Sequence, residues 1–120
     1  MKKVLIVDDS EYNRVLLSSL LRKKGLQVDL SGDGEDALKK FVAGKPDAVF
    51  LDYIMPGKSG VEALVEMKKL NPNFIAIMLT SISAAEDVEK AKEAGASGYI
   101  LKPYTSEKIY DILKKFNLIE

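Results

Sequence analysis

Five short strand-like segments alternate with longer amphipathic stretches, and this alternation limits the chain to very few folds. Four of the segments are apolar runs at residues 4–7, 48–51, 75–79 and 99–101, and the fifth, at residues 27–30, alternates between apolar and polar residues. Runs this short do not form helices, and their Val, Ile and aromatic residues are typical of strands buried on both faces. The alternating segment is therefore expected at an edge of the sheet.

Helical patterns separate these segments. The last helix has the clearest pattern, because its apolar residues follow the i, i+3, i+4, i+7 spacing. The apolar positions of the helices are Leu16, Leu17, Leu20, Leu21, Leu38, Phe41, Val42, Val61, Leu64 and Val65, and then Ile109, Ile112, Leu113 and Phe116.

One helix, from about Ala84 to Ala94, differs from the others. Its inward candidates are only Ala85, Val88 and Ala91. Because little apolar area means weak anchoring, we expect this helix to be the mobile one.

Capping residues indicate where several helices begin and end. Two segments match the capping box, and three glycines follow helical patterns as stops. The capping boxes are Ser59-x-x-Glu62 and Ser83-x-x-Glu86, and the glycines are Gly25, Gly44 and Gly95.

Strict alternation of strand and helix predicts a parallel sheet with helices on both faces, because each right-handed crossover places a helix on one side. With residues 27–30 at an edge, the strand order 2-1-3-4-5 of a doubly wound, flavodoxin-like α/β fold fits best. A chain of 120 residues with 47% hydrophobic content builds one core, so residues 1–120 are expected to form one domain. Its ligands are expected where the strand order reverses, outside the carboxyl ends of strands 1 and 3.

Composition excludes several classes of function. Lys plus Arg and Asp plus Glu both number 18, so no net charge favours nucleic acid or an anionic membrane. The absence of cysteine and histidine excludes disulfides, thiol catalysis and Cys/His zinc sites. No apolar stretch approaches a membrane span and no signal pattern leads the chain. A cytoplasmic protein without membrane insertion or direct nucleic-acid binding is expected.

Polar residues end four of the predicted strands. Asp8 and Asp9 follow the first strand, Asp52 follows the third, and Thr80 and Lys102 follow the fourth and fifth. Clustered carboxylates repel one another unless a cation compensates, and Mg²⁺ prefers oxygen ligands while keeping positions open for a phosphoryl group. A lysine and a hydroxyl beside such a site would neutralise and bind phosphoryl oxygens.

Four motifs together resemble the receiver domain of two-component response regulators, the CheY-like superfamily. They are residues 4–10, residues 51–56 with Gly60, residues 78–81 and residues 95–104, in the order and spacing of the family. The resemblance spans essentially the whole chain and supplies part of the support for the strand order. It implies a phosphorylation-activated signalling switch that phosphorylates and dephosphorylates itself, rather than an enzyme that turns over an external substrate.

The resemblance also implies the roles of the site residues. Asp52 would take a phosphoryl group from a phosphohistidine on a sensor histidine kinase or a histidine phosphotransfer protein. Asp9 and Asp52 would bind Mg²⁺, or Mn²⁺ in its place, together with the backbone carbonyl of Ile54, and Asp8 would bind it mainly through water.

The remaining members of the family's site are implied in the same way. Lys102 would pair with the phosphoryl group, Thr80 would turn its hydroxyl towards it, and Tyr99 would move inward behind Thr80. The Lys102–Pro103 peptide bond would be cis.

The resemblance places partners on two surfaces. The first helix would dock on the kinase, which makes Tyr12, Asn13 and Arg14 candidates for partner binding, and we add Tyr104. An unidentified downstream target would bind the face formed by the helix after Ser83, the strand of Tyr99 and the last helix. A monomer is the default expectation, with dimerisation on activation as the alternative.

Several alternatives stay open at this point. A flavin mononucleotide carrier would share the fold, but the acids after the first strand would repel its phosphate. A small Mg²⁺-dependent phosphatase with an aspartyl nucleophile is the enzymatic rival. Within the receiver class, a chemotaxis effector, a phosphorelay intermediate and a single-domain regulator are not separated, and the chain could also be an excised piece of a longer regulator. Apolar Ile54 and Ile82 beside the site suggest slow dephosphorylation.

Overall fold

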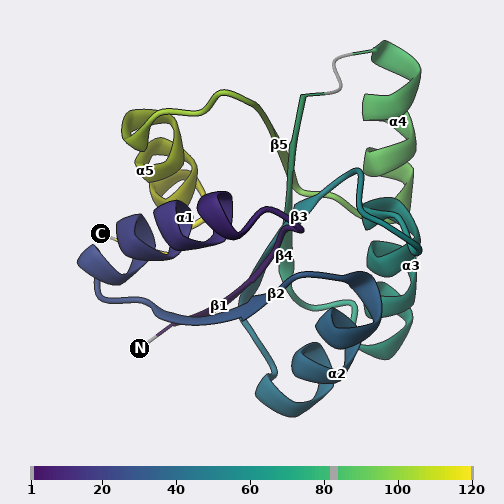
Figure 1. Cartoon of the computed structure of the whole chain (residues 1–120), viewed down its shortest axis with the longest axis horizontal. Helices are drawn as coiled ribbons and strands as arrows, with labels where there is room; N and C mark the ends of the chain where they lie inside the picture. Colours follow the sequence, from purple (N-terminus) through teal and green to yellow (C-terminus); the bar gives the residue numbers. More distant parts are fainter. Residues whose placement is uncertain (1, 82–83, 120) are drawn as a thin grey trace.

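Strands and helices alternate strictly in the computed structural model, which describes residues 2–81 and 84–119 (Figure 1). The elements are β1 (Lys3–Val7), α1 (Glu11–Lys23), β2 (Gln27–Ser31), α2 (Gly34–Gly44), β3 (Ala48–Asp52), α3 (Gly60–Leu70), β4 (Ile75–Thr80), α4 (Ala85–Ala94), β5 (Gly98–Leu101) and α5 (Ser106–Lys115). None of the helices in these two ranges is both long and apolar enough to cross a membrane.

The five strands form one parallel sheet in the order β2-β1-β3-β4-β5. The predicted order is confirmed, and the alternating strand β2 lies at an edge. In the register between β1 and β3, Val7 pairs with Leu51, so β3 extends one residue, Asp52, beyond the end of β1. The strand order reverses between β1 and β3. In sheets of this kind, ligands bind at this reversal, outside the carboxyl ends of the strands.

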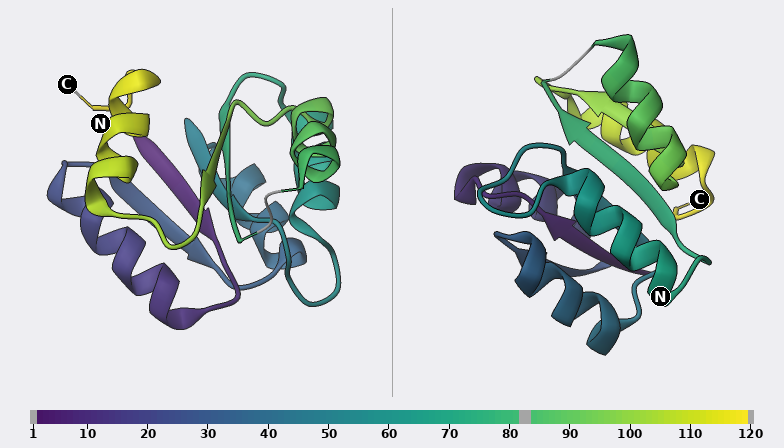
Figure 2. Two further views of the ribbon diagram at one scale, coloured as in Figure 1. Left: turned by 90° about the horizontal axis from the view of Figure 1, so that it is seen from above. Right: turned by 90° about the vertical axis from the view of Figure 1, so that its right-hand side faces the viewer.

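Helices cover both faces of the sheet, with α1 and α5 on one side and α2, α3 and α4 on the other (Figures 1 and 2). Alternate residues of β1 supply the two cores. Val4 and Ile6 face the α1 and α5 layer, and Leu5 and Val7 face the other layer. The predicted inward positions Leu16, Val42 and Val65 are instead 39%, 56% and 37% exposed, because they lie at the border of the apolar stripe on their helices.

Helix starts follow the predicted caps where the structure describes them. Ser59 caps α3 through a complete capping box with Glu62. The predicted cap Ser83 lies outside the described residues, and the structure places the N-cap of α4 at Ala84, which makes no side-chain cap hydrogen bond.

Helix ends confirm two of the three predicted glycine stops. Gly25 and Gly95 adopt positive φ after α1 and α4. Gly44 was expected to end α2 in the same way, but it is the last helical residue, and Lys45 takes the left-handed conformation with φ 47°. Gly44 has another reason to lack a side chain, because a Cβ there would lie 2.8 Å from Lys3 Nζ.

The helix α4 is thinly anchored, as its composition predicted. Of its residues, all of which the structure describes, only Ala91 is buried. Ala85, predicted to face inward, is exposed because it lies in the first turn, beyond the end of the core. In contrast, α5 buries Ile109 and Leu113.

We therefore expect the amide protons of α4 to exchange with deuterium faster than those of α5, because less buried apolar surface resists local opening. Native-state hydrogen exchange followed by NMR measures both helices in one sample. Equal protection of the two helices would contradict the prediction.

Candidate functional site

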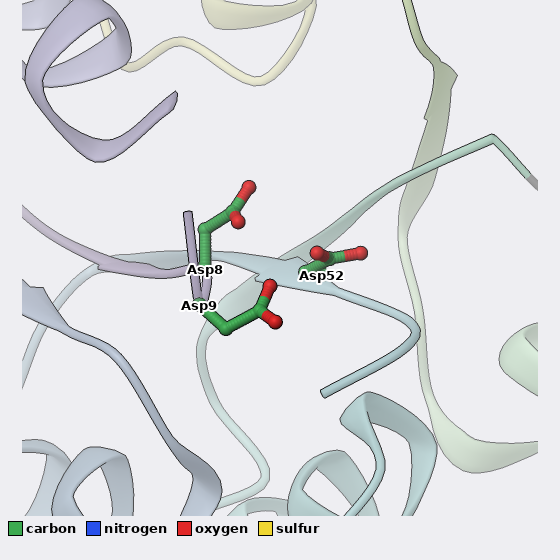
Figure 3. A group of neighbouring side chains, drawn as sticks. All are labelled: Asp8, Asp9 and Asp52. Carbon is green, nitrogen blue, oxygen red and sulfur yellow. The ribbon is translucent and has the colours of Figure 1, made fainter. Parts of the chain in front are cut away.

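The carboxyl edge of the sheet gathers the predicted acidic residues. Asp8 and Asp9 directly follow β1, and Asp52 is the last residue of the neighbouring strand β3. Figure 3 shows the three side chains grouped at the ends of these strands. One carboxylate oxygen from each residue lies within 4.8 Å of the others. The structure thus brings together residues from two separate parts of the chain in a cluster that suits a hard cation.

Two of these carboxylates are buried. Asp8 is 1% exposed and Asp52 is 6% exposed, whereas Asp9 is exposed. The backbone after β1 is tightly held: the Asp8 amide donates to the Ser31 carbonyl oxygen at 3.0 Å, and the Ser10 amide donates to Asp8 Oδ1 at 2.9 Å. Buried charges of like sign require compensation nearby.

Lys102 supplies that compensation from the residue after β5. Its Nζ lies 3.2 Å from Asp8 Oδ2 and 3.3 Å from Asp52 Oδ2. Its backbone amide donates to the Thr80 carbonyl oxygen at 2.8 Å. Burial acts to lower the pKa of Lys102, but Asp52 and then Asp8 outweigh it, so the pKa is raised and the ammonium stays charged. The Lys102–Pro103 bond is cis, as expected.

The surroundings of Asp52 shift the pKa of its carboxyl group. Burial, followed by the nearby charge of Asp8, raises the pKa of its carboxyl group, while Lys102 acts in the opposite direction. The Ile54 amide donates weakly to Asp52 Oδ1 at 3.4 Å, and the Ile54 side chain is 61% exposed. A buried carboxylate held beside an ammonium can act as a nucleophile towards an electrophile that enters from the solvent side.

Thr80 and Tyr99 lie on adjacent strands behind the acids. Thr80 ends β4 and is 1% exposed, and Tyr99 on β5 is half-buried. Burial, then Tyr53 and Asp87, raise the pKa of Tyr99. Sequence reasoning missed Tyr53 and Asp87, because they lie on different elements and their proximity depends on how α4 packs. Burial and then Asp87 also raise the pKa of Tyr53, the residue next to Asp52.

Gly60 fixes the position of the loop that follows Asp52 through close contacts with the backbone. Its amide donates to the Tyr53 carbonyl oxygen at 2.9 Å, and an added Cβ would lie 2.0 Å from the Asp52 carbonyl oxygen. No side chain fits at that distance. The start of α3 is therefore pressed against the backbone of the candidate nucleophile.

Three of the four expected partner residues, Tyr12, Asn13 and Tyr104, line a groove beside the site. The groove, of about 500 Å³, is bordered by Tyr12, Asn13, Leu16, Ser81, Lys102, Pro103 and Tyr104. Tyr12 is 74% exposed. The Tyr104 hydroxyl is buried without a hydrogen-bond partner in the described part of the chain, and burial, then Asp8 and Asp52, raise its pKa to about 12. The guanidinium of Arg14 instead bonds to the backbone of Asp8.

Comparison with known proteins gives matches along nearly the whole chain. The response regulator receiver domain matches residues 4–114. The chemotaxis protein CheY of Halobacterium salinarum is 38% identical over 112 residues, covering 93% of each chain. The sporulation initiation phosphotransferase F of Bacillus subtilis is 35% identical over 115 residues, covering 96% of this chain and 93% of that protein.

Solved structures match as well. A chain in the CheX–CheY–BeF3–Mg²⁺ complex from Borrelia burgdorferi superposes with a TM-score of 0.91 at 28% identity, covering 96% of this chain and 89% of that chain. The match is consistent with the strand order and the two helical layers described above.

Replacing Gly60 with Ala is expected to lower the free energy of unfolding by about 2 kcal/mol, because the new methyl group must displace backbone atoms. Gly57→Ala is the matched control in the same loop. Gly57 has φ +76° but nothing within 4 Å of an added Cβ, so that variant bears only the left-handed backbone cost of about 1 kcal/mol. Urea unfolding compares the two, and a smaller loss for Gly60→Ala would contradict the account.

Replacing Asp52 with Asn is expected to raise the free energy of unfolding at pH 7, by about 1 kcal/mol. Burial and the nearby charge of Asp8 hold the folded-state pKa of Asp52 above its ordinary value of 3.8. The stability that this carboxyl contributes is therefore complete below 3.8 and is lost as the pH rises through the folded-state value. Urea unfolding across this window should show the gain shrinking as the pH falls. A variant that is less stable than wild type at pH 7 would refute the expectation.

Proposed function

The chain belongs to the family of response regulator receiver domains, and we propose that it is a phosphorylation-activated switch of a two-component system. In this proposal Asp52 accepts a phosphoryl group from a phosphohistidine of a sensor histidine kinase or a histidine phosphotransfer protein in the cytoplasm. The observation that carries it is the buried Asp52 carboxylate, whose Oδ2 lies 3.3 Å from Lys102 Nζ at the open end of the sheet.

Asp8, Asp9 and Asp52 would hold Mg²⁺, with the Ile54 carbonyl oxygen as a further ligand. The residues fit such an ion, because three carboxylates have oxygens within 4.8 Å of one another and the Lys102 ammonium contacts two of them. When bound, the ion supplies positive charge that offsets the charge of the phosphoryl oxygens. Mn²⁺ would serve in its place.

Asp52 performs the covalent step. A carboxylate oxygen attacks phosphorus while the bond from phosphorus to the imidazole nitrogen breaks, and that nitrogen keeps the electron pair and takes a proton. Lys102 stabilises the transferred group by turning its ammonium from the carboxylates to the phosphoryl oxygens. Because Lys102 already contacts Asp52, this movement is short.

Thr80 and Tyr99 would convert the new charge into a change of shape. A phosphoryl group adds roughly −1.5 to −2 charge and strong acceptors, which favours a donor such as the Thr80 hydroxyl. Tyr99 would then move inward behind Thr80. The thinly anchored α4, whose Asp87 lies beside Tyr53 and Tyr99, is suited to respond. The readout would be the face of α4, β5 and α5 on which a downstream target binds.

The groove beside α1 is the proposed kinase-docking surface. Tyr12 and Asn13 border it, and Tyr12 and Val15 are 74% and 58% exposed. Exposed aromatic and aliphatic residues next to a reactive centre favour contact with a partner helix. Tyr104 and Arg14 remain part of this prediction, although the hydroxyl of Tyr104 is buried.

The proposal also concerns the signalling pathway and the lifetime of the phosphoryl group on Asp52. The relatives include both a chemotaxis protein and a sporulation phosphotransferase, so similarity favours neither role. The exposed apolar side chain of Ile54 offers no group to orient water, which supports slow dephosphorylation. Ile82, the other residue in that hypothesis, lies outside the described residues.

Incubation with radiolabelled phosphoramidate and Mg²⁺ tests the function. We expect at most one phosphoryl group per chain, carried on Asp52, and no label on Asp52→Asn. Lys102→Ala should label at least about a hundredfold more slowly, the scale of losing one charge-stabilising donor. Sustained hydrolysis of an added phosphomonoester would favour the rival phosphatase, and labelling of Asp52→Asn would refute the assignment.

A further inference from the structure

Arg14, in the first turns of α1, holds the peptide group that joins Asp8 to Asp9. Its Nη1 donates to the Asp8 carbonyl oxygen at 2.6 Å. The amide on the other side of Asp8 is held by the Ser31 carbonyl oxygen at 3.0 Å. The backbone of Asp8 is therefore fixed from α1 on one side and from β2 on the other.

Gly32 leaves room for this contact. A Cβ at residue 32 would lie 3.1 Å from Arg14 Nη1 and 3.7 Å from Arg14 Cζ. The guanidinium thus lies against the loop that follows β2 while it bonds to the loop that follows β1. A Cβ at residue 32 would therefore require the guanidinium to shift by a few tenths of an ångström.

Asp9 depends most on this contact. Lys102 contacts the carboxylates of Asp8 and Asp52, whereas within residues 2–81 and 84–119 no group donates a hydrogen bond to the exposed Asp9 carboxylate. Its direction is therefore set by its own rotamer and by the backbone that carries it. Rotation of the peptide between Asp8 and Asp9 would carry the Asp9 carboxylate out of the acidic cluster.

Arg14 and Lys102 also differ in the kind of oxygen that each one occupies. Arg14 bonds to a carbonyl oxygen, so it occupies no carboxylate oxygen that a cation would use. A guanidinium carries a positive charge at neutral pH. Its charge by itself would repel a divalent cation, while its hold on the backbone would favour binding. The two effects predict changes of opposite sign when Arg14 is removed.

We infer that Arg14 is a positioning residue that aims Asp9 at a bound divalent cation, and that the absence of a side chain at Gly32 admits its guanidinium. This inference rests on the proposed function only where that function makes Asp9 a metal ligand. Loss of a residue that orients a ligand typically weakens metal binding by about tenfold or more. Positioning therefore outweighs charge repulsion in this account.

Mn²⁺ titration, followed by the electron paramagnetic resonance signal of the free ion, tests the inference. Arg14→Met should weaken Mn²⁺ binding by about tenfold. Arg14→Lys keeps the charge but loses the planar guanidinium, so it should fall between wild type and Arg14→Met. Gly32→Ala, which leaves Arg14 in the sequence, should weaken binding in the same direction by a smaller factor.

Arg22→Met is the matched control on the same helix. Arg22 also bonds to a backbone carbonyl, with Nη2 3.4 Å from the Val28 oxygen, but it lies away from the acids. Urea unfolding without metal should show similar small losses for both methionine variants, and only Arg14→Met should lose Mn²⁺ affinity. This separates positioning from general stability.

Unchanged or tighter Mn²⁺ binding by Arg14→Met would overturn the inference, as would an effect equal to that of Arg22→Met. Failure of the proposed function looks different. In that case wild type would bind Mn²⁺ more tightly than Arg14→Met, yet phosphoramidate would leave Asp52 unlabelled.

Discussion

Repulsion between the buried carboxylates of Asp8 and Asp52 is the constraint on which the rest of this structure depends. Both residues are nearly inaccessible, at 1% and 6% exposure, and one ammonium, that of Lys102, contacts both. A buried pair of like charges is tolerated only where a cation is held in place. The parallel sheet provides that place, because it brings the ends of β1, β3 and β5 to one edge.

Much of this arrangement could be predicted from the sequence. Asp8, Asp52 and Lys102 each follow a short apolar run, and in a parallel sheet the ends of such runs meet. Five runs separated by amphipathic helices sufficed for the fold class, and the resemblance to receiver domains strengthened the strand order. The end of α2 was missed: Lys45 adopts positive φ, while Gly44 is small because Lys3 packs against it.

Contacts between elements were not predictable in this way. The bond from Arg14 to the Asp8 backbone and the proximity of Asp87 to Tyr53 depend on side-chain directions and helix placement, which leave no periodic signal in the sequence. These contacts connect the acidic edge to its surroundings. Arg14 connects this edge to α1. Tyr53 connects it to α4, the helix in which only Ala91 is buried. A charge added at Asp52 would therefore act on an edge that is rigid on one side and weakly held on the other.

The central claim is that Asp52 receives the phosphoryl group while Lys102 moves to stabilise it. A crystal structure of the chain with Mg²⁺ and beryllofluoride, a mimic of the acyl phosphate, tests this most directly. The account predicts beryllium bonded to an Asp52 carboxylate oxygen and the Lys102 ammonium bonded to fluoride, no longer 3.2 Å from Asp8 Oδ2. Beryllofluoride bound elsewhere, or Lys102 still paired with Asp8 beside an occupied Asp52, would contradict it.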